Sequence, residues 1–231
     1  LNTIVAEAFC EACDYIEAAE NKDMAIHDLI ERYFMEHERI VFDGNGYSDE
    51  WVAEAAKRGL PNLKTMVDAI PALTTEKAVA LFEKFGVFTR AELESRAEIQ
   101  YETYAKVINI EAKSMIDIAS KQLIPAVIKY TKELADTVIA VKASGVDASV
   151  QEEILRKTTT LLGESRNALA KLKELDAQAN KLSRGEKQAK FFNKEVVPAM
   201  DALRKPIDKL EMIVEKDMWP MPSYGDLIFE V

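Results

Sequence analysis

The longest helical pattern in this sequence, residues 89–144, restricts the chain to a largely helical fold. Apolar side chains recur there at steps of three and four residues that average roughly 3.64, the period of an unstrained α-helix. Thr89 and Glu92 have capping-box spacing, and Gly145 is suited to end the helix. Pro125 lies inside the run and is expected to kink or divide it. The apolar stripe consists of Tyr101, Tyr104, Ile108, Ala112, Met115, Ala119, Leu123, Ala126, Tyr130, Leu134, Val138 and Val141.

Residues 149–182 carry a different pattern. Ser149 and Glu152 have the spacing of a second capping box. Apolar or small residues then follow in alternating steps of four and three, which predicts left-handed coiled-coil packing. Thr158 and Ser165 are expected to weaken this seam. Its members are Ile154, Thr158, Leu161, Ser165, Ala168, Leu172, Leu175, Ala179 and Leu182.

The remainder of the chain completes a hairpin and adds a tail. A tight turn at residues 183–185 leads into a last helix, which Pro198 and Pro206 are expected to bend. Because short loops join antiparallel neighbours, residues 149–216 are predicted to form a hairpin against the second half of the long helix. Residues 219–231 are rich in proline and are predicted to be non-helical. The aromatic residues of this tail are expected to anchor it within the chain or on another subunit: Trp219, Tyr224 and Phe229.

Short helices and turns occupy the N-terminal part. Helical patterns cover residues 2–19 and 23–39, and shorter helices are capped by Ser48 and by Thr74 or Thr75. The predicted fold class is therefore all-α: a long central helix and an antiparallel helical hairpin form an elongated bundle, preceded by short helices. We divide the chain into residues 1–88, read as the continuation of an upstream domain, and residues 89–231.

Charge and hydropathy exclude several partners. The 231 residues include 30 Lys and Arg against 40 Asp and Glu, a net charge of −10. Because phosphate backbones and anionic lipids select clustered positive charge, nucleic acid and membrane surfaces are not expected as partners. No apolar run approaches the ~18 residues of a membrane span. We expect a cytoplasmic protein and, because the sequence begins at Leu1 inside a helical pattern, a piece of a longer polypeptide.

Cys10 and Cys13 form a C-x-x-C pair in the first helix. Such a pair can be a redox site or half of a zinc site, but no second Cys/His pair has zinc spacing and no strand precedes it. The alternative is that both are small apolar residues on a helix in a reducing compartment, which is the interpretation we favour.

Two other groups have the spacing of metal sites. Asp23, His27 and Glu31 share one helix face, which can hold a metal but is more typical of a solvated acidic face. The second group, Asp43, Asn45, Asp49 and Glu54, falls on positions 1, 3, 7 and 12 of a calcium-binding EF-hand loop. Tyr47 and Ser48 occupy positions that such a loop gives to a ligand and to glycine, so a structural turn followed by a helix cap is favoured. His37 is expected on the surface near a helix end.

No catalytic constellation emerges from the sequence. The segment Gly44-Asn45-Gly46 is too short to be a phosphate loop, and no dinucleotide or P-loop motif occurs. No serine or cysteine nucleophile has a recognisable setting, and no carboxylate pair stands out for acid–base work. The chain is therefore predicted to contain no catalytic, cofactor-binding or metal-binding residues of its own.

Several motifs together resemble the C-terminal region of type III glutamine synthetases. The resemblance covers nearly the whole chain, although residues 149–193 match mainly in character. Residues 43–46 read Asp-Gly-Asn-Gly where that family more often has Asn-Gly-Asp-Gly, a change that keeps the turn chemistry. The segments that carry the resemblance are residues 37–51, 57–63, 86–89 with Glu92, Ser95, Arg96 and Glu98, then Tyr104, 109–111, 123–127, 197–200, 219–220 and 224–227.

This resemblance implies a parent ligase that joins ammonia to glutamate at the expense of ATP, with Mg or Mn as divalent metals. Its metal, nucleotide and phosphate ligands would lie upstream of Leu1, so this fragment would bind none of these cofactors and would be inactive alone. Residues 2–19 would pack beneath that site. The implied partners are the upstream catalytic domain and further copies in a homo-oligomer. The alternative is a self-standing helical interaction module, which the heptad hairpin motivates.

Overall fold

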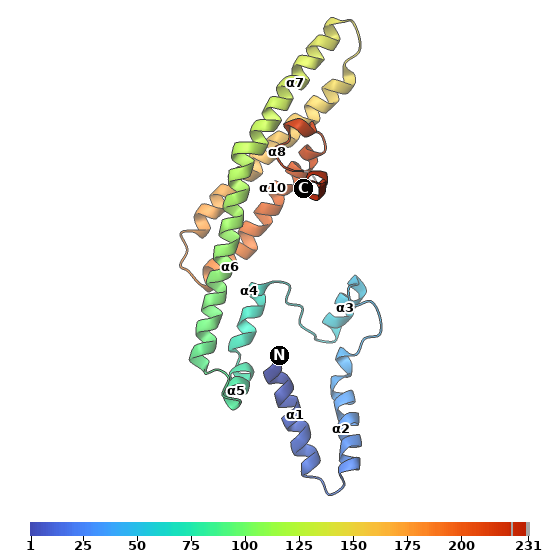
Figure 1. The fold of residues 1–231 in the computed structure, drawn as a ribbon, viewed down its shortest axis with the longest axis vertical. Helices are drawn as coiled ribbons and strands as arrows, with labels where there is room; N and C mark the ends of the chain where they lie inside the picture. Colours follow the sequence, from blue (N-terminus) through green and yellow to red (C-terminus); the bar gives the residue numbers. More distant parts are fainter. Residues whose placement is uncertain (223, 230–231) are drawn as a thin grey trace. The chain divides into compact units, whose positions relative to one another are not determined.

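The computed structural model of this chain describes residues 1–222 and 224–229. The chain divides into two compact units, residues 1–100 and residues 101–231. Within the described residues every regular element is a helix or a helical turn, and none is a strand (Figure 1). The all-α prediction, with a long helix, a helical hairpin and short N-terminal helices, is confirmed.

The first unit is built from short helices joined by turns. Asn21, Ser48 and Thr75 each cap a helix, because their side-chain oxygens accept the backbone N–H three residues ahead at 3.1, 3.2 and 3.3 Å. The elements are α1 (Asn2–Glu17), α2 (Lys22–His37), the 3₁₀ turn η1 (Glu38–Ile40), α3 (Asp49–Lys57), α4 (Met66–Ala69), the 3₁₀ turn η2 (Ile70–Thr74), α5 (Glu76–Lys84) and the beginning of α6 (Arg90–Ile118).

Little of α1 is covered within this unit. The helix packs on α2 and α5, and the Lys84 ammonium lies 2.6 Å from the Glu7 carboxylate. Helix α2 buries Ala25 and Leu29, whereas no α1 side chain is buried. Phe9 is 67% exposed as a result. The first unit therefore presents an apolar helix surface, which a partner would be needed to cover.

The predicted capping box at the start of α6 is present. The Thr89 N–H donates to the Glu92 carboxylate at 2.8 Å, and the Glu92 N–H donates to the Thr89 hydroxyl at 3.4 Å. The bond from the Thr89 N–H, together with one from the Thr89 hydroxyl to the same carboxylate at 2.9 Å, lowers the pKa of the Glu92 carboxyl, since both favour its charged form. Each side chain thus satisfies a backbone donor that the first helical turn leaves free.

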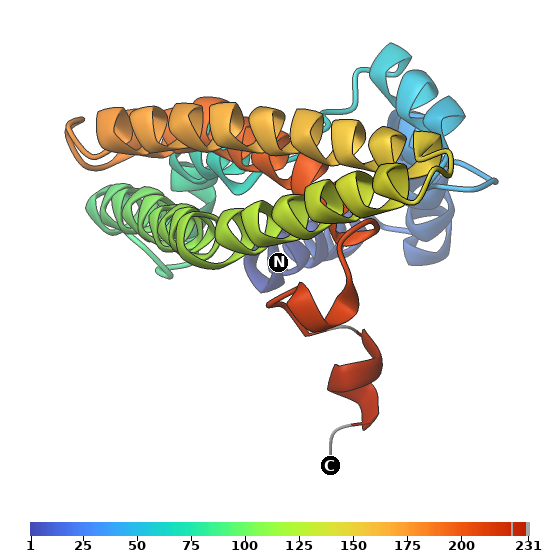
Figure 2. The ribbon, with the colours of Figure 1, turned by 90° about the horizontal axis from the view of Figure 1, so that it is seen from above.

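The second unit is a bundle in which α8 lies between two neighbours. Helices α7 and α8 form one hairpin, and α8 and α10 form the next, so α8 packs on both (Figures 1 and 2). The predicted hairpin against the second half of the long helix is confirmed. The elements after α6 are the π-helical turn η3 (Ala119–Leu123), α7 (Ile124–Ala143), α8 (Ser149–Ala179), α9 (Glu186–Phe191), the π-helical turn η4 (Phe192–Val196), α10 (Val197–Glu211), the 3₁₀ turn η5 (Lys216–Met218) and α11 (Tyr224–Phe229).

Both π-helical turns end two residues before a proline. Pro125 follows η3, and Pro198 follows η4. After each turn, the next backbone N–H donates to the carbonyl five residues earlier. Ile124 donates to Ala119, and Val197 donates to Phe192. A proline has no N–H, and its ring crowds the preceding turn. A wider turn accommodates the ring, so η3 separates α6 from α7 just before Pro125 while the backbone stays helical, a form of interruption that the sequence did not indicate.

Most of the predicted heptad seam is buried in α8, including its polar members, whereas Ile154 and Ala168 are partly buried and Leu182 lies beyond the helix and is 38% exposed. Thr158 and Ser165 are fully buried, and their hydroxyls donate to the carbonyls of Ile154 and Leu161 at 2.8 Å. Back-bonding of this kind satisfies the hydroxyls without a partner on another helix. A core cluster beside the seam joins α7, α8 and the end of α10, and consists of Val127, Leu161, Leu210 and Val214.

The second predicted capping box is wrong. Ser149 is already the first residue of α8, and it makes no capping bond to Glu152. Asp147 acts instead: its carboxylate accepts the Ser149 N–H at 3.2 Å and the Ser149 hydroxyl at 2.6 Å. Glu152 forms ion pairs with Lys142 and with Arg156. The Ser149 hydroxyl and the Asp147 carboxylate both lie near the helix start, and the charged carboxylate is the stronger acceptor of the two.

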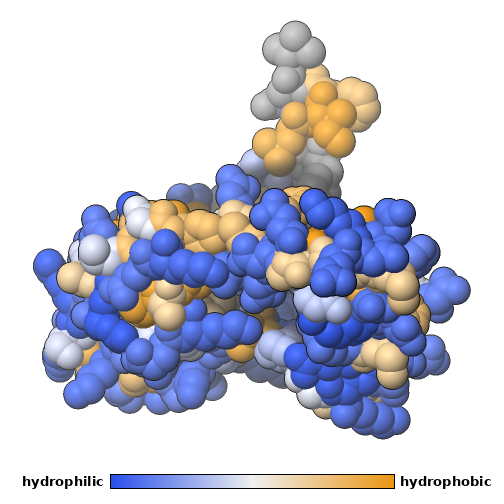
Figure 3. Space-filling view, turned by 90° about the horizontal axis from the view of Figure 1, so that it is seen from below, coloured by the Kyte–Doolittle hydropathy of each residue, from blue (hydrophilic) through white to orange (hydrophobic). Residues whose placement is uncertain are grey.

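The prediction of a non-helical tail is also wrong, because residues Tyr224–Phe229 form α11. The prolines of the tail all precede this stretch, so they do not interrupt it. Trp219 anchors within the chain: it packs on the core cluster, and its indole N–H donates to Glu211 at 3.1 Å. Phe229 is 81% exposed, and the side chain of Tyr224 lies outside the described residues. The C-terminal segment carries a hydrophobic surface (Figure 3).

Asp176 is a buried carboxylate in α8. Its side chain is 8% exposed, and its Oδ1 atom has no hydrogen-bond partner among the described residues. Burial raises the pKa of the Asp176 carboxyl, although Lys113 and the Asn180 side chain act in the opposite direction. A carboxyl with a raised native pKa binds protons more tightly in the folded state, so stability falls as pH rises from the ordinary aspartate pKa through the raised one.

Replacing Asp176 with asparagine should therefore stabilise the chain near neutral pH. We expect a gain of about 1 kcal/mol, the usual scale for relieving an unsatisfied buried polar group. The gain should shrink at acidic pH, below the raised pKa of the Asp176 carboxyl, where the wild-type group is protonated. Urea unfolding of both proteins at the two pH values measures this difference. If the two proteins differed in unfolding free energy by the same amount at both pH values, the gain could not come from removing the Asp176 charge.

Candidate functional site

The loop between α2 and α3 has the most specific local structure in the first unit. Asn45 forms a turn with its side chain, which accepts the Tyr47 N–H at 3.0 Å, while its carbonyl accepts the Ser48 N–H at 3.1 Å. Ser48 then caps α3. Asparagine, glycine and serine favour such turns because their short side chains bond to the nearby backbone or tolerate unusual conformations. The predicted interpretation of residues 43–54, a structural turn followed by a helix cap, is confirmed.

An aromatic pair joins the two ends of this loop. The rings of Phe42 and Trp51 are stacked, with centroids 4.1 Å apart and planes at 22°. Gly44 lies against this pair, because a Cβ atom there would come within 2.7 Å of the Phe42 ring. A side chain at position 44 would therefore force the Phe42 ring to shift on Trp51.

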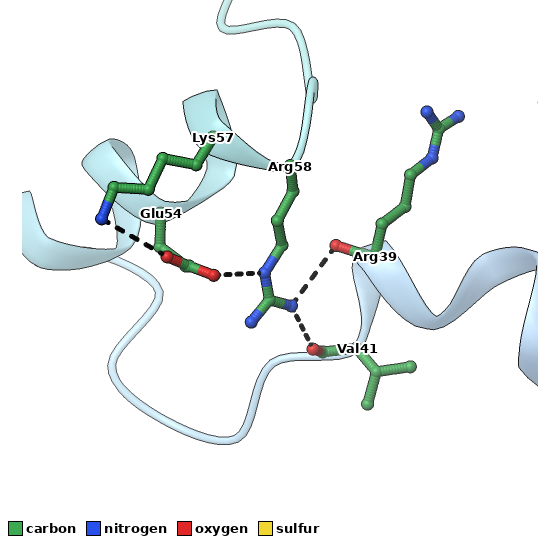
Figure 4. A network of polar contacts seen from close by, with 5 residues as sticks. All are labelled: Arg39, Val41, Glu54, Lys57 and Arg58. Atoms are coloured by element: carbon green, nitrogen blue, oxygen red, sulfur yellow. Dashed lines mark hydrogen bonds and ion pairs between the residues drawn. The ribbon is translucent and has the colours of Figure 1, made fainter.

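Arg58 closes the loop from the last turn of α3 (Figure 4). Its Nη1 atom donates to the carbonyls of Val41 at 2.8 Å and Arg39 at 3.4 Å. Its Nε atom donates to the Glu54 carboxylate at 2.8 Å, and its guanidinium carbon lies 5.5 Å from the centre of the Trp51 ring. Guanidinium groups suit this role because they offer several donors in one plane. We call these contacts the Arg58 clamp.

Glu54 holds the arginine in place. The hydrogen bond from Arg58 is the largest cause that lowers the pKa of the Glu54 carboxyl; burial opposes it, and the charges of Arg58 and Lys57 add to it. The Lys57 ammonium is more distant, 3.9 Å from the carboxylate. Glu54 therefore remains ionised near neutral pH and is engaged in the clamp.

The clamp fixes a loop whose tip faces outward. Tyr47 is 100% exposed, and the loop backbone on both sides of it is held by the Asn45 turn and by Arg58. A preorganised loop of this kind loses little conformational entropy on binding. Chemically, the arrangement supplies a rigid contact surface with a phenol and free peptide groups.

The other residues singled out in the sequence are not brought together. Cys10 and Cys13 lie on α1 as expected, but both are exposed, because this chain buries no side chain of α1. Asp23, His27 and Glu31 are all exposed on α2, in agreement with a solvated face. Among residues 1–222 and 224–229, no three His, Cys, Asp or Glu side chains are grouped so that they could hold a metal ion.

Sequence reasoning missed the role of Arg58. Glu54 and Arg58 are four residues apart on a helix, which indicates a local ion pair. The bonds to the carbonyls of residues 39 and 41 join positions 19 and 17 apart in the chain. No periodic pattern reports contacts of that kind. His37, by contrast, lies in the last turn of α2 and is exposed, as predicted.

Helical scaffold and clamped loop together define an all-α domain that presents a preorganised loop. A family model described as the glutamine synthetase C-terminal domain matches residues 25–142, a range that includes the whole clamp. The chain belongs to this glutamine synthetase C-terminal domain family.

Individual relatives agree with the family match. A glutamine synthetase of Butyrivibrio fibrisolvens is 33% identical over 208 residues, covering 89% of this chain and 30% of that protein. A type-3 glutamine synthetase of Dictyostelium discoideum is 32% identical over 242 aligned residues, covering 99% of this chain and 32% of that protein. A glutamine synthetase of Bacteroides fragilis is 27% identical, with 93% and 30% covered. The chain thus spans about a third of the length of these relatives.

In the part of the chain that the structure describes, no helix is both long enough and apolar enough to cross a membrane.

Proposed function

We propose that this chain is the helical C-terminal part of a glutamine synthetase, a ligase that joins ammonia to glutamate with the energy of ATP. The observation that carries the proposal is the match of residues 25–142 to the C-terminal domain of that family. The share of the relatives that this chain covers, 30–32%, supports a division in which most of the enzyme is a separate region. In this proposal the chain serves glutamine biosynthesis by supporting that region.

The uncovered face of α1 supports a docking role. Leu1, Val5 and Phe9 are spaced four residues apart, so they share one helix face, and they are 92%, 45% and 67% exposed. Burial of apolar surface is worth about 25 cal/mol per Å². We assign this face to the catalytic region of the same polypeptide. The clamped loop, which lies in the same unit, is a second candidate contact, and further copies of the polypeptide are expected as homo-oligomeric partners.

The proposal places the chemistry outside this chain. ATP and the Mg or Mn ions of the parent enzyme would be bound by the catalytic region, and no catalytic, nucleotide-binding or metal-binding residue is assigned here. The positions considered for metals are exposed on α1, on α2 and in the loop up to the start of α3, except Glu54, which is engaged with Arg58. The helices would hold the catalytic region in its active arrangement.

An assay of γ-glutamyl hydroxamate formation tests this division. The full-length polypeptide encoded by the gene should form the hydroxamate in the presence of ATP and Mg or Mn, and the 231-residue chain should form none. The full-length protein with Phe9→Asp should lose assembly or activity, because a charge would enter the α1 contact. Gln151→Asp, on α8 in the second unit, is the matched control. Activity of the chain alone would refute the proposal.

The second candidate, a self-standing helical interaction module, rests on the heptad pattern of α8. The central members of that seam, Leu161, Leu172 and Leu175, are buried within this chain, so most of the pattern is used internally. Reading the gene upstream of Leu1 discriminates the two candidates. A coding region for a β-rich domain with paired glutamates supports the enzyme, and an immediate start codon supports the module.

A further inference from the structure

A hollow between η3 and α8 in the second unit has a lining unlike the rest of this acidic chain. Its volume is about 290 Å³, and two of its lining side chains are cationic while none is acidic. The full chain carries a net charge of −10. The lining residues are Ser120, Ile124, Arg166, Leu169, Ala170 and Lys173.

Both cations are available to a ligand. Arg166 and Lys173 are seven residues apart on α8, so they lie on one side of the helix, about 10 Å apart along its axis. Their neighbour Lys171 pairs with Glu174 at 3.1 Å. Neither Arg166 nor Lys173 forms an ion pair with any residue that the structure describes. Flexible side chains of this length can converge on one anion placed between them.

Ser120 supplies an unused hydrogen-bonding group at the same place. Its hydroxyl oxygen is buried and has no partner among the described residues. Thr158 and Ser165 in α8 satisfy their hydroxyls by donating to a carbonyl four residues back. Ser120 lies in the π-helical turn, where the backbone pattern is shifted by one residue, and no such bond forms.

The other π-helical turn provides an internal comparison. Its polar residue Asn193 accepts a hydrogen bond from the Tyr104 hydroxyl at 3.0 Å. Both turns accommodate a proline in the same way, yet only the turn at Ser120 leaves a buried side-chain oxygen without a partner in the described part of the chain. The proline that follows the turn therefore does not by itself explain why the buried Ser120 hydroxyl has no hydrogen-bond partner among the described residues. π-helical turns occur frequently at functional sites.

We propose that this hollow binds a phosphate-type anion, either inorganic phosphate or the phosphoryl group of a small ester. Two cations with no acid in the lining match a ligand that carries about −1.5 to −2 charges near pH 7, whereas a carboxylate carries one. The Ser120 hydroxyl donates to an oxygen of the anion, and the guanidinium of Arg166 offers two parallel donors. Ile124, Leu169 and Ala170 provide an apolar wall for the organic part of an ester. This inference is independent of the glutamine synthetase proposal.

Titration calorimetry of the chain at constant ionic strength tests the site, because constant salt removes general screening effects. Inorganic phosphate, glycerol 3-phosphate and acetate serve as probes. We expect saturable binding of at least one phosphate compound, much weaker binding of acetate, and a higher thermal midpoint in the presence of the bound compound. Tighter binding of glycerol 3-phosphate than of phosphate would identify an ester as the natural ligand, and the reverse order would identify the free ion.

Substitutions locate the binding. Arg166→Gln and Lys173→Gln should each weaken it about tenfold, and Ser120→Ala about threefold, because charged hydrogen bonds contribute more than neutral ones. Lys171→Gln is the matched control: it removes one positive charge from the same helix but lies outside the lining, and it should change affinity less than twofold. Circular dichroism checks that each variant is folded.

Three results would overturn the proposal: no saturable binding of either phosphate compound, acetate binding as tightly as phosphate, or Lys171→Gln weakening binding as much as Arg166→Gln. The first two exclude a dianion site, and the third reduces the effect to general surface charge.

Discussion

Replacing Phe192 with alanine should lower the free energy of unfolding by about 3–5 kcal/mol, the range found for truncating a buried phenylalanine. Phe192 is 0% exposed and is one of the largest fully buried side chains of the chain. It is also the first residue of η4, and its carbonyl accepts the N–H of Val197. The truncation leaves a cavity at the wide turn, where the helix already departs from regular bonding. Urea unfolding followed by circular dichroism measures the loss.

Met212→Ala is the control for this substitution. Met212 is 85% exposed, so its truncation should change stability by less than about 0.5 kcal/mol. If Phe192→Ala proved equally mild, Phe192 would not be part of a packed core, and the arrangement of η4 against its neighbours would be wrong. Phe192→Leu should recover more than half of the loss, because it refills most of the cavity.

Replacing Arg58 with alanine should release the loop between α2 and α3. Two carbonyls and one carboxylate lose their donor. Hydrogen bonds to charged groups contribute about 1.5–3 kcal/mol in protected sites. Because the Arg58 side chain is 29% exposed, we expect about 1–2 kcal/mol in local opening free energy. Hydrogen exchange of the loop amides, together with Trp51 fluorescence, reports the loss.

Two further variants separate the geometry of the clamp from its charge. Arg58→Lys keeps the charge but has no planar fork, so it should restore little of the loop's protection. Lys57→Ala removes the more distant cation, 3.9 Å from the Glu54 carboxylate, and should leave exchange nearly unchanged. Full protection in Arg58→Lys would show that charge alone holds the loop.

The clamp shows why only part of the candidate site was predictable. The turn at Asn45 and the cap at Ser48 depend on side chains that bond to backbone within three residues, so residue types in order are sufficient to predict them. Contacts from Arg58 to residues 39 and 41 depend on how α3 folds back along the chain. The stack of Phe42 on Trp51 depends on the same reversal, and neither contact leaves a periodic trace in the sequence.

A similar distinction explains the errors at helix ends. The capping box at Thr89 was predicted correctly because Glu92, three residues ahead, accepts the Thr89 N–H and, within the described residues, is not drawn into an ion pair with another helix. At the start of α8 two acidic groups were available, and Asp147 formed the bond while Glu152 paired with Lys142 on α7. When two acidic side chains lie near a helix start, the sequence does not show which of them will instead pair with a residue of another helix.

By itself, the sequence determined that the chain is helical, that a capping box starts the long helix at Thr89, and that α8 buries most of a heptad seam, since these properties follow from the period of apolar side chains and from bonds between near neighbours. Only the three-dimensional structure showed that Pro125 and Pro198 follow π-helical turns, that Arg58 clamps the loop, and that Ser120, Arg166 and Lys173 line one hollow. The clamp and the hollow require residues distant in sequence to meet, and the packing of whole helices decides which of them do.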